Sequence, residues 1–287
     1  MADIYTSSGV IAPVILAEEI RREMLEALQT TVRVAPLVKN FDLSGVKSKS
    51  FSVPVWGTVT AASVGETTDL ASTAFTPTEN TITYGEAGVM TLLTDTAAET
   101  STAPGIAEAY GRNGALAVGR LIDTDIAALF NSTNGGTNIG NDASTMAVQM
   151  FLRGIYTLEL ENVLGNYVSV LSSQQAHNLR LEVNSSSAIT IGRFLAEKAR
   201  DDGFIGNLYG VDTYIINVAE VSSATSTSKF GIIMGQGDMS PFGLGVWRPA
   251  RVELERNASF RGTEVVISAA YGIKEIRDKA GVAFKAK

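Results

Sequence analysis

The sequence PGIAEAYGRNGALAVGRLIDTDIAALFN, residues 104–131, predicts one long helix against which the rest of the chain packs. Residues 100–102 are Thr-Ser-Thr and are available as N-caps, and Pro104 suits the first turn of a helix. Beyond Phe130 the run NSTNGGTNIGND is rich in Asn and Gly, which tolerate left-handed backbone and end helices. We therefore expect the helix to end near Asn131.

Apolar residues recur along this helix at helical spacing and predict two contact faces. One face consists of Ile106, Tyr110, Ala117, Leu121 and Ala128. The other consists of Val118, Ile122, Ile126, Leu129 and Phe130. Glycines at positions 111, 114 and 119 each cost about 1 kcal/mol relative to Ala inside a helix. They indicate either the close approach of another backbone or a bend in the helix.

The composition narrows the classes of protein to which the chain can belong. Its 287 residues are enough for about two domains with hydrophobic cores. Charged residues make up 18%, below the average of about 25%, so we expect large surfaces to be covered by something other than solvent. The net charge of −7, without a basic stripe, argues against a dedicated nucleic-acid reader. No apolar run approaches the roughly 20 residues that span a bilayer, and no signal-peptide pattern is present, so we expect synthesis in the cytoplasm and no membrane contact.

The residues that usually carry chemistry are scarce and scattered. The chain has no cysteine, and its single histidine, His177, lies in a predicted helix, where a structural or surface role is favoured. Asp123 and Asp125 are two residues apart on the long helix, so they point to different faces and cannot share a metal or a proton. The Asn-rich run lacks the acidic ligands of a calcium loop. Because no nucleotide-binding or catalytic motif is present, we expect no enzyme, no cofactor and no metal site.

The first hundred residues predict an arm followed by a long β-hairpin. In residues 1–40 a polar lead precedes a short amphipathic helix, which is marginal alone and needs a packing surface from elsewhere. Residues 41–99 change to a period of two, most clearly in SFSVPVW at 50–56 and TITY at 81–84. An isolated hairpin is marginally stable at best. This one must therefore lean on the body of its own chain or on a neighbouring copy, and its exposed edges suit the second alternative.

After the long helix the pattern alternates between helix and strand, which predicts a sheet covered by helices. Helices are expected at 145–161, at SQQAHNLRL and at GRFLAEKA, with strands at YVSVLS, VDTYIIN and KFGIIMG. Two long strands, VWRPARVELERN and TEVVISAAY, then flank a turn near residues 257–262. We expect these strands to pair with residues 82–93 of the hairpin and to form a sheet on which the long helix lies.

This order of segments resembles the major capsid protein of tailed bacteriophages, with the Hong Kong 97-type fold. The resemblance rests on APLVKNFDLSG at 35–45, KSFSVPVWG at 49–57, GET at 65–67, LLTDTAAET at 92–100 and GFIGNLYGVDTYIINVAE at 203–220. It implies an α+β fold with a long spine helix, an extended β-hairpin loop, and peripheral and axial domains. The implied divisions are an N-terminal arm at 1–40, the extended loop at 41–99, a peripheral domain at 100–144 and 244–271, and an axial domain at 145–243 and 272–287.

The resemblance implies a structural subunit that self-assembles, as hexamers and pentamers, into the icosahedral head shell around packaged double-stranded DNA. Such a subunit is part of the virion, contacts DNA without sequence specificity and works with a portal. The short arm implies a separate scaffolding protein, and a decoration protein is compatible with the sequence. An encapsulin, a bacterial compartment of similar fold, is the alternative, and an enzyme with a new type of site ranks last.

For the subunit interface we expect the acids Glu66 and Asp69 of the hairpin to pair with arginines of a neighbour's final strands, namely Arg248, Arg251, Arg256 or Arg261. Trp56 and Trp247 are candidate anchors, because buried aromatic residues and Arg dominate interface energies. The alternative is that both Trp side chains belong to the core of their own chain.

One part of the family joins neighbouring subunits covalently, through a lysine of the extended loop and an asparagine. In this chain the lysines lie at 39, 47 and 49 and then not before 198, so residues 50–99 offer no amine. We therefore expect a shell that is held together without covalent bonds.

Overall fold

The structure is a computed structural model and describes residues 22, 32–57, 59, 61, 63–64, 72, 74, 76–96, 106–163, 165–185, 204–216 and 228–287. The arm helix predicted within 1–40, the helix predicted at GRFLAEKA and the hairpin residues Glu66 and Asp69 lie outside these residues. The described chain contains mixed helices and sheets, which confirms the predicted α+β class.

The long helix, α3, spans Ile106–Ala128 and ends as predicted, within three residues of Asn131. A short 3-10 helix, η2 (Phe130–Ser132), follows it, and a second, η3 (Asn134–Gly136), turns the chain away. Asn134, Gly135 and Gly136 all have positive φ angles. The Asn- and Gly-rich run therefore ends the helix for the conformational reason that the sequence indicated.

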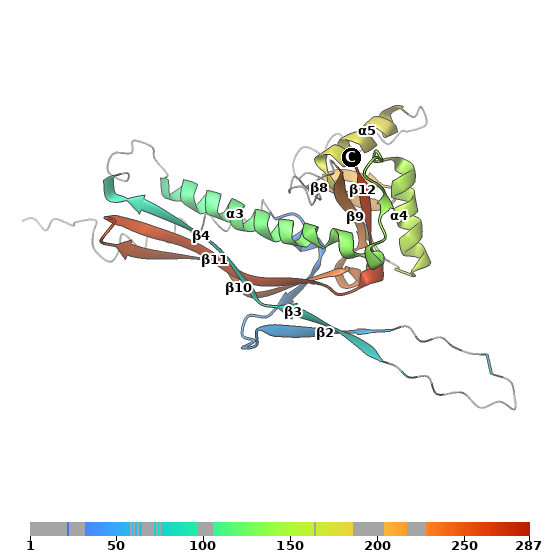
Figure 1. The fold of residues 1–287 in the computed structure, drawn as a ribbon, viewed down its shortest axis with the longest axis horizontal. Coiled ribbons are helices and arrows are strands. Elements are labelled where there is room, and N and C mark those ends of the chain that lie inside the picture. The colour runs from blue at the N-terminus through green and yellow to red at the C-terminus, as the bar shows by residue number, and fades with distance from the viewer. Residues whose placement is uncertain are drawn as a thin grey trace, which may run out of the picture.

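A four-stranded sheet lies along α3, and its strand order is β1-β10-β11-β4 (Figure 1). Its strands are β1 (Lys39–Asp42), β10 (Phe242–Asn257), β11 (Gly262–Glu275) and β4 (Gly85–Thr94). β10 and β11 form the long antiparallel ribbon that the sequence predicted, and β4 pairs with β11 over its whole length. Alternation along β10 places Ala250, Val252 and Leu254 against the core.

A six-stranded sheet forms the second body, with α4 (Val148–Leu160) and α5 (Ser173–Ser185) packed beside it (Figure 1). Its strands, in order across the sheet, are β5 (Ile139–Gly140), β12 (Gly281–Ala286), β9 (Lys229–Gly235), β6 (Tyr167–Ser172), β8 (Val211–Ile216) and β7 (Phe204–Leu208). His177 lies on α5 and is exposed, as its predicted surface role requires.

The extended hairpin is built differently from the prediction. Its paired part consists of β2 (Ser50–Trp56) and β3 (Pro77–Thr83), which form a separate two-stranded sheet. Ile82 pairs with Phe51 inside this hairpin, so the expectation that residues 82–93 form one partner of the final strands was wrong at its start. The chain leaves one sheet at Tyr84 and enters the other at β4, which follows directly on β3 (Figure 1).

The contact faces of α3 also differ from the prediction. The buried side chains and glycines lie on one face, which includes Ala115, Val118, Ile126 and Gly114. Ala117, Leu121 and Ala128, assigned to the other face, are not buried in this chain. The close approach that the glycines indicated is present at Gly114, where an added Cβ atom would lie 2.2 Å from Cδ1 of Ile267 on β11.

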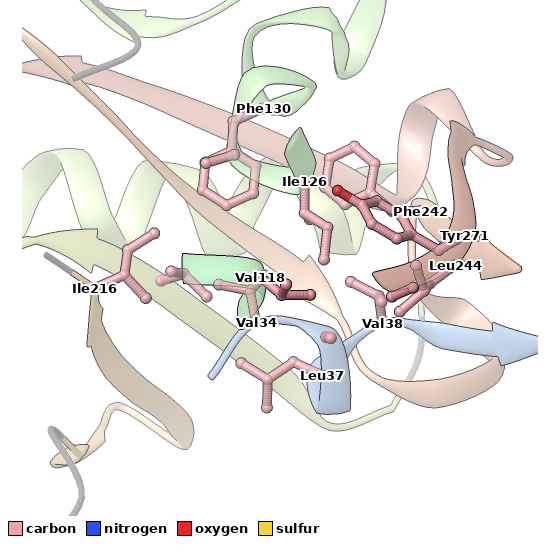
Figure 2. Close-up of a cluster of buried hydrophobic side chains, with 14 of the residues drawn as sticks. Val34, Leu37, Val38, Val118, Ile126, Phe130, Ile216, Phe242, Leu244 and Tyr271 are labelled. Atoms are coloured by element: carbon pink, nitrogen blue, oxygen red, sulfur yellow. The ribbon is translucent and has the colours of Figure 1, made fainter. Parts of the chain in front are cut away.

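A first hydrophobic core joins the four-stranded sheet and the six-stranded sheet at the C-terminal end of α3. Ile126 and Phe130 meet Phe242, Leu244 and Tyr271 of the β10–β11 ribbon, and the segment that precedes β1 contributes Val34, Leu37 and Val38 (Figure 2). The rings of Phe130 and Phe242 stack at 5.8 Å. Each buried side chain of this size contributes about 1.5–3 kcal/mol to folding, so the core holds the helix, the sheet and the incoming chain together.

Candidate subunit interface

Of the arginines expected at the interface, Arg251 lies on the solvent face of the four-stranded sheet, Arg256 alternates onto the same side of β10 as Leu254, and Arg261 lies in the turn between β10 and β11. Side chains alternate along β10, so Arg251, Glu253 and Glu255 lie on the face opposite to α3. Glu253 pairs with Val266 of β11, and Val266 pairs in turn with Met90 of β4. Met90 is 62% exposed. The face thus combines both signs of charge with apolar side chains.

Three of the four arginines form ion pairs within their own chain. Arg248 binds Glu86, and Arg251 Nη2 lies 2.9 Å from Glu253 Oε1. Arg256 donates two hydrogen bonds to Asp95, of 2.5 Å from Nη1 to Oδ1 and 2.6 Å from Nη2 to Oδ2. The pairs of Arg248 and Arg256 span β11 and connect β10 with β4 and with the residue that follows it.

The arginines set the protonation of their partners. The hydrogen bond from Arg248 lowers the pKa of Glu86, and the hydrogen bonds from Arg256 lower the pKa of Asp95. Arg256, Asp95 and Glu86 are exposed and Arg248 is half-buried, and ion pairs near the surface contribute little to stability. Arg261 is the one of the four that forms no ion pair with a described residue, and its backbone carbonyl accepts a hydrogen bond of 2.9 Å from Asp95 N–H. An interface acid could bind Arg261 without displacing a described partner.

The two tryptophans differ in their surroundings. Trp247 is half-buried, donates a hydrogen bond of 2.9 Å from Nε1 to the Ser48 carbonyl, and packs edge-on against Tyr84 at 5.7 Å. It therefore stabilises the base of the hairpin in its own chain, in line with the alternative interpretation. Trp56 lies at the end of β2 and is 58% exposed, as an anchor for a neighbour would have to be.

Trp56 also lines a groove of about 730 Å³ between the hairpin and the rest of the chain. The other wall is formed by the loop after α4, the end of β11 and the connection from β11 to β12, and it includes Glu161, Lys274, Arg277 and Asp278. The charges of these residues are mixed in sign, and apolar side chains such as Val163 and Met239 also line the groove.

Two acids of α3 were predicted to point to different faces of the helix. Asp123 is 2% exposed and accepts hydrogen bonds from the N–H groups of Arg33, at 3.0 Å, and Val34, at 3.1 Å. Burial raises its pKa, and these hydrogen bonds oppose the rise. Asp125 instead accepts a hydrogen bond of 2.7 Å from the Tyr271 hydroxyl, so the two acids do lie on different faces of α3.

Glu275 was not considered in the sequence analysis, since an isolated acid near the end of a strand carries no signal. Burial is the main cause of its raised pKa, and Ser132 donates a hydrogen bond of 2.6 Å to Oε2. In the part of the chain that the structure describes, no group of three or more acids or histidines is placed to hold a metal ion. No helix within the same residues is long and apolar enough to cross a membrane.

Comparisons of the whole chain reveal likeness in structure but not in sequence. No protein-family model matches the sequence, and no curated protein matches it. The solved capsid of Ralstonia phage GP4 is similar with a TM-score of 0.66 at 11% identity, over 90% of this chain and 92% of that one. A chain of Mycobacterium phage Che8 is similar with a TM-score of 0.62 at 19% identity, over 83% and 85% of the two chains.

A virus-like particle from Pyrococcus furiosus is similar with a TM-score of 0.61 at 9% identity, over 93% of this chain and 98% of that one. Such coverage of both chains means that the likeness concerns the whole architecture. The chain has the Hong Kong 97-type fold of tailed-phage capsid proteins.

Proposed function

We propose that the chain is the major capsid protein of a tailed bacteriophage, a structural subunit of the icosahedral shell that encloses packaged double-stranded DNA. The observation that carries this proposal is the likeness of nearly the whole chain to a phage capsid at a TM-score of 0.66. The subunit would be part of the virion after synthesis in the cytoplasm of the bacterial host, and it would have no catalytic role.

The shape of the chain supports an assembling subunit. The β2–β3 hairpin projects away from both sheets (Figure 1), and the outer residues of β3, Pro77–Glu79, are exposed. A pair of strands with so little buried surface gains stability when a neighbouring copy covers it. The division into arm, extended loop, peripheral domain and axial domain is part of this proposal, as are a separate scaffolding protein, a portal and room for a decoration protein.

The contact with DNA is proposed to be non-specific. A shell needs no base readout, and the net charge of −7 offers no basic stripe for one. The encapsulin alternative is less favoured, because several solved phage capsids and heads are similar to nearly the whole chain. Genome neighbourhood separates the two, since terminase and portal genes would lie near a capsid gene and a cargo enzyme gene near an encapsulin gene.

The assembly test is electron microscopy of the purified protein, produced with and without the scaffolding protein of its own genome. We expect closed shells of uniform diameter when the scaffold is present. Persistent monomers under conditions that assemble other phage capsids would contradict the proposal.

The interface prediction is tested by charge reversal on the hairpin. Glu66→Lys is expected to reduce the yield of shells, and Arg261→Glu in the same chain to restore it, because Arg261 is free of ion pairs with described residues. Glu66→Gln is the matched control, since it removes charge without repulsion. If Glu66→Lys assembles as well as the unmodified protein, this pairing is wrong.

A further inference from the structure

The base of the hairpin lies on a part of the β10–β11 ribbon that carries glycines on its outer face. At the start of β10, Phe242 and Leu244 are buried in the first core, so the alternate residues Gly243 and Gly245 face the other side. On β11, Gly272 is the register partner of Gly245. Glycine inside a strand often marks the close approach of another backbone.

Ile82 of β3 occupies this place and has no exposed surface. A Cβ atom added at Gly245 would lie 2.8 Å from Leu43 Cδ1, 3.2 Å from Trp247 Cζ3 and 3.4 Å from Ile82 Cγ2. A Cβ atom added at Gly272 would lie 3.0 Å from Ile82 Cγ2. The Cβ atom at Gly272 would also lie 2.1 Å from the carbonyl oxygen of Thr83. A backbone oxygen cannot rotate away as a side chain can, so alanine at 272 requires the hairpin to move.

Two hydrogen bonds between described residues also hold the hairpin segment to the ribbon side. Asn80 Nδ2 donates to the carbonyl of Ile276 at 2.7 Å, and Trp247 Nε1 donates to the carbonyl of Ser48 at 2.9 Å. Ser48 lies at the base, before β2, and Asn80 is the middle residue of β3, whereas Pro77–Glu79 beyond it are exposed. The hairpin is therefore attached to the ribbon through its inner half, and its outer half projects beyond these contacts.

We propose that the socket formed by Gly245 and Gly272, with Ile82 inserted in it, positions the hairpin and thereby sets the diameter of the shell. The inference rests on the proposed function. Each hairpin strand has seven residues, a length of about 23 Å, so a displacement of about 1 Å at the socket becomes larger at the far end. Neighbouring subunits would be contacted at the far end of the hairpin. The angle between subunits, and therefore the curvature of the shell, then depends on how the socket holds Ile82.

The direction of the hairpin can be measured in the full-length chain, since the absence of cysteine allows two spin labels to be placed by introduced cysteines. Thr76→Cys on the hairpin and Glu159→Cys on α4 are both exposed positions. We expect Gly272→Ala to shift the distance between the labels by a few Å and Ile82→Ala to broaden the distance distribution. Gly57→Ala is the matched control, because the nearest atom to its Cβ would be Thr76 O at 3.9 Å, and it should leave the distance unchanged.

Electron microscopy of the same variants, without labels, tests the consequence for assembly. We expect Gly272→Ala and Ile82→Ala to form no shells or shells of mixed diameter, and Gly57→Ala to form the shells of the unmodified protein. If Gly272→Ala does not fold, as judged by circular dichroism, Ile82→Ala alone decides the question.

A variant that folds and keeps both the label distance and the shell diameter of the unmodified protein would overturn the socket. Failure of the unmodified protein to form shells would instead count against the proposed function. The label distances would still test whether the socket fixes the hairpin.

Discussion

Gly114 shows how one missing side chain lets the helix approach the sheet. Its added Cβ atom would lie 2.2 Å from Ile267 Cδ1, the tip of a side chain on β11. Gly114→Ala gains about 1 kcal/mol of helix propensity but overfills the contact, which costs about 1–3 kcal/mol. Ile267→Val removes the atom that clashes. We therefore expect the double variant to be more stable than the two single changes predict, by at least about 0.5 kcal/mol.

Urea unfolding of the unmodified protein, Gly114→Ala, Ile267→Val and the double variant measures the coupling between the two substitutions. Each midpoint is compared at the same protein concentration in the unassembled state. Additive effects of the two substitutions would mean that α3 and β11 are not in contact at Gly114.

Asp123 holds the segment before β1 on the helix, and its titration makes stability depend on pH. Its folded pKa is raised by burial above the unfolded value of about 3.9. The folded state therefore binds the proton more tightly, and stability is highest below the unfolded pKa and falls as the pH rises through the folded pKa. Asp123→Asn cannot ionise, so we expect its stability to fall less than that of the unmodified protein over the same pH range.

Thermal unfolding from pH 3 to pH 7 compares the two proteins. The side-chain amide that this variant introduces places a donor near two backbone N–H groups, which costs about 1–3 kcal/mol at every pH. The test is therefore the slope of stability against pH and not its absolute value. Identical slopes would show that Asp123 does not titrate as the structure implies.

At the scale of elements, Tyr271 connects the ribbon to the helix. Its hydroxyl donates a hydrogen bond of 2.7 Å to Asp125 Oδ2. Burial first, then this hydrogen bond, raises the pKa of Tyr271 above its ordinary value of about 10. The contribution of the Tyr271 hydroxyl to folding stability is therefore complete below pH 10 and is lost as the pH rises further. Tyr271→Phe should cost about 1–2 kcal/mol at neutral pH and reduce the loss of stability above pH 10.

Circular dichroism of the whole protein during urea unfolding, at pH 7 and at about pH 10.5, gives the stability of each protein at neutral pH and its loss at alkaline pH. Tyr84→Phe, on a tyrosine that packs against Trp247 at the hairpin base, is a control for the loss of a hydroxyl elsewhere. If Tyr271→Phe and the unmodified protein lose equal stability at alkaline pH, the role of this hydroxyl is contradicted.

At the scale of the whole molecule, the position of the lysines predicts how a shell would be held together. Residues 50–99 contain no lysine, so the extended loop lacks the amine that a covalent link to a neighbour requires. Particles boiled in detergent should therefore run on a denaturing gel as a single band near 30.3 kDa. A ladder of larger bands would show that another residue makes a covalent link.

The sequence by itself determined the elements with strong local signals. The end of α3, the β10–β11 ribbon and most helices and strands of the second body follow from apolar periodicity and from Asn and Gly with positive φ angles. These signals act within a few residues, so no knowledge of distant contacts is needed. The pattern Phe-Gly-Leu-Gly at 242–245 is a further local signal, because glycine inside a strand often marks the close approach of another backbone.

Only the tertiary structure decided which face of α3 is buried, because Leu121 and Val118 are both apolar and the sheet covers the face of Val118. It also gave Arg248, Arg251 and Arg256 acidic partners in their own chain. Glu86 and Asp95 are 162 and 161 residues away from the arginines they bind, and the strand register alone brings them together. Pairing between distant residues depends on how sheets and helices pack, which local sequence patterns do not encode.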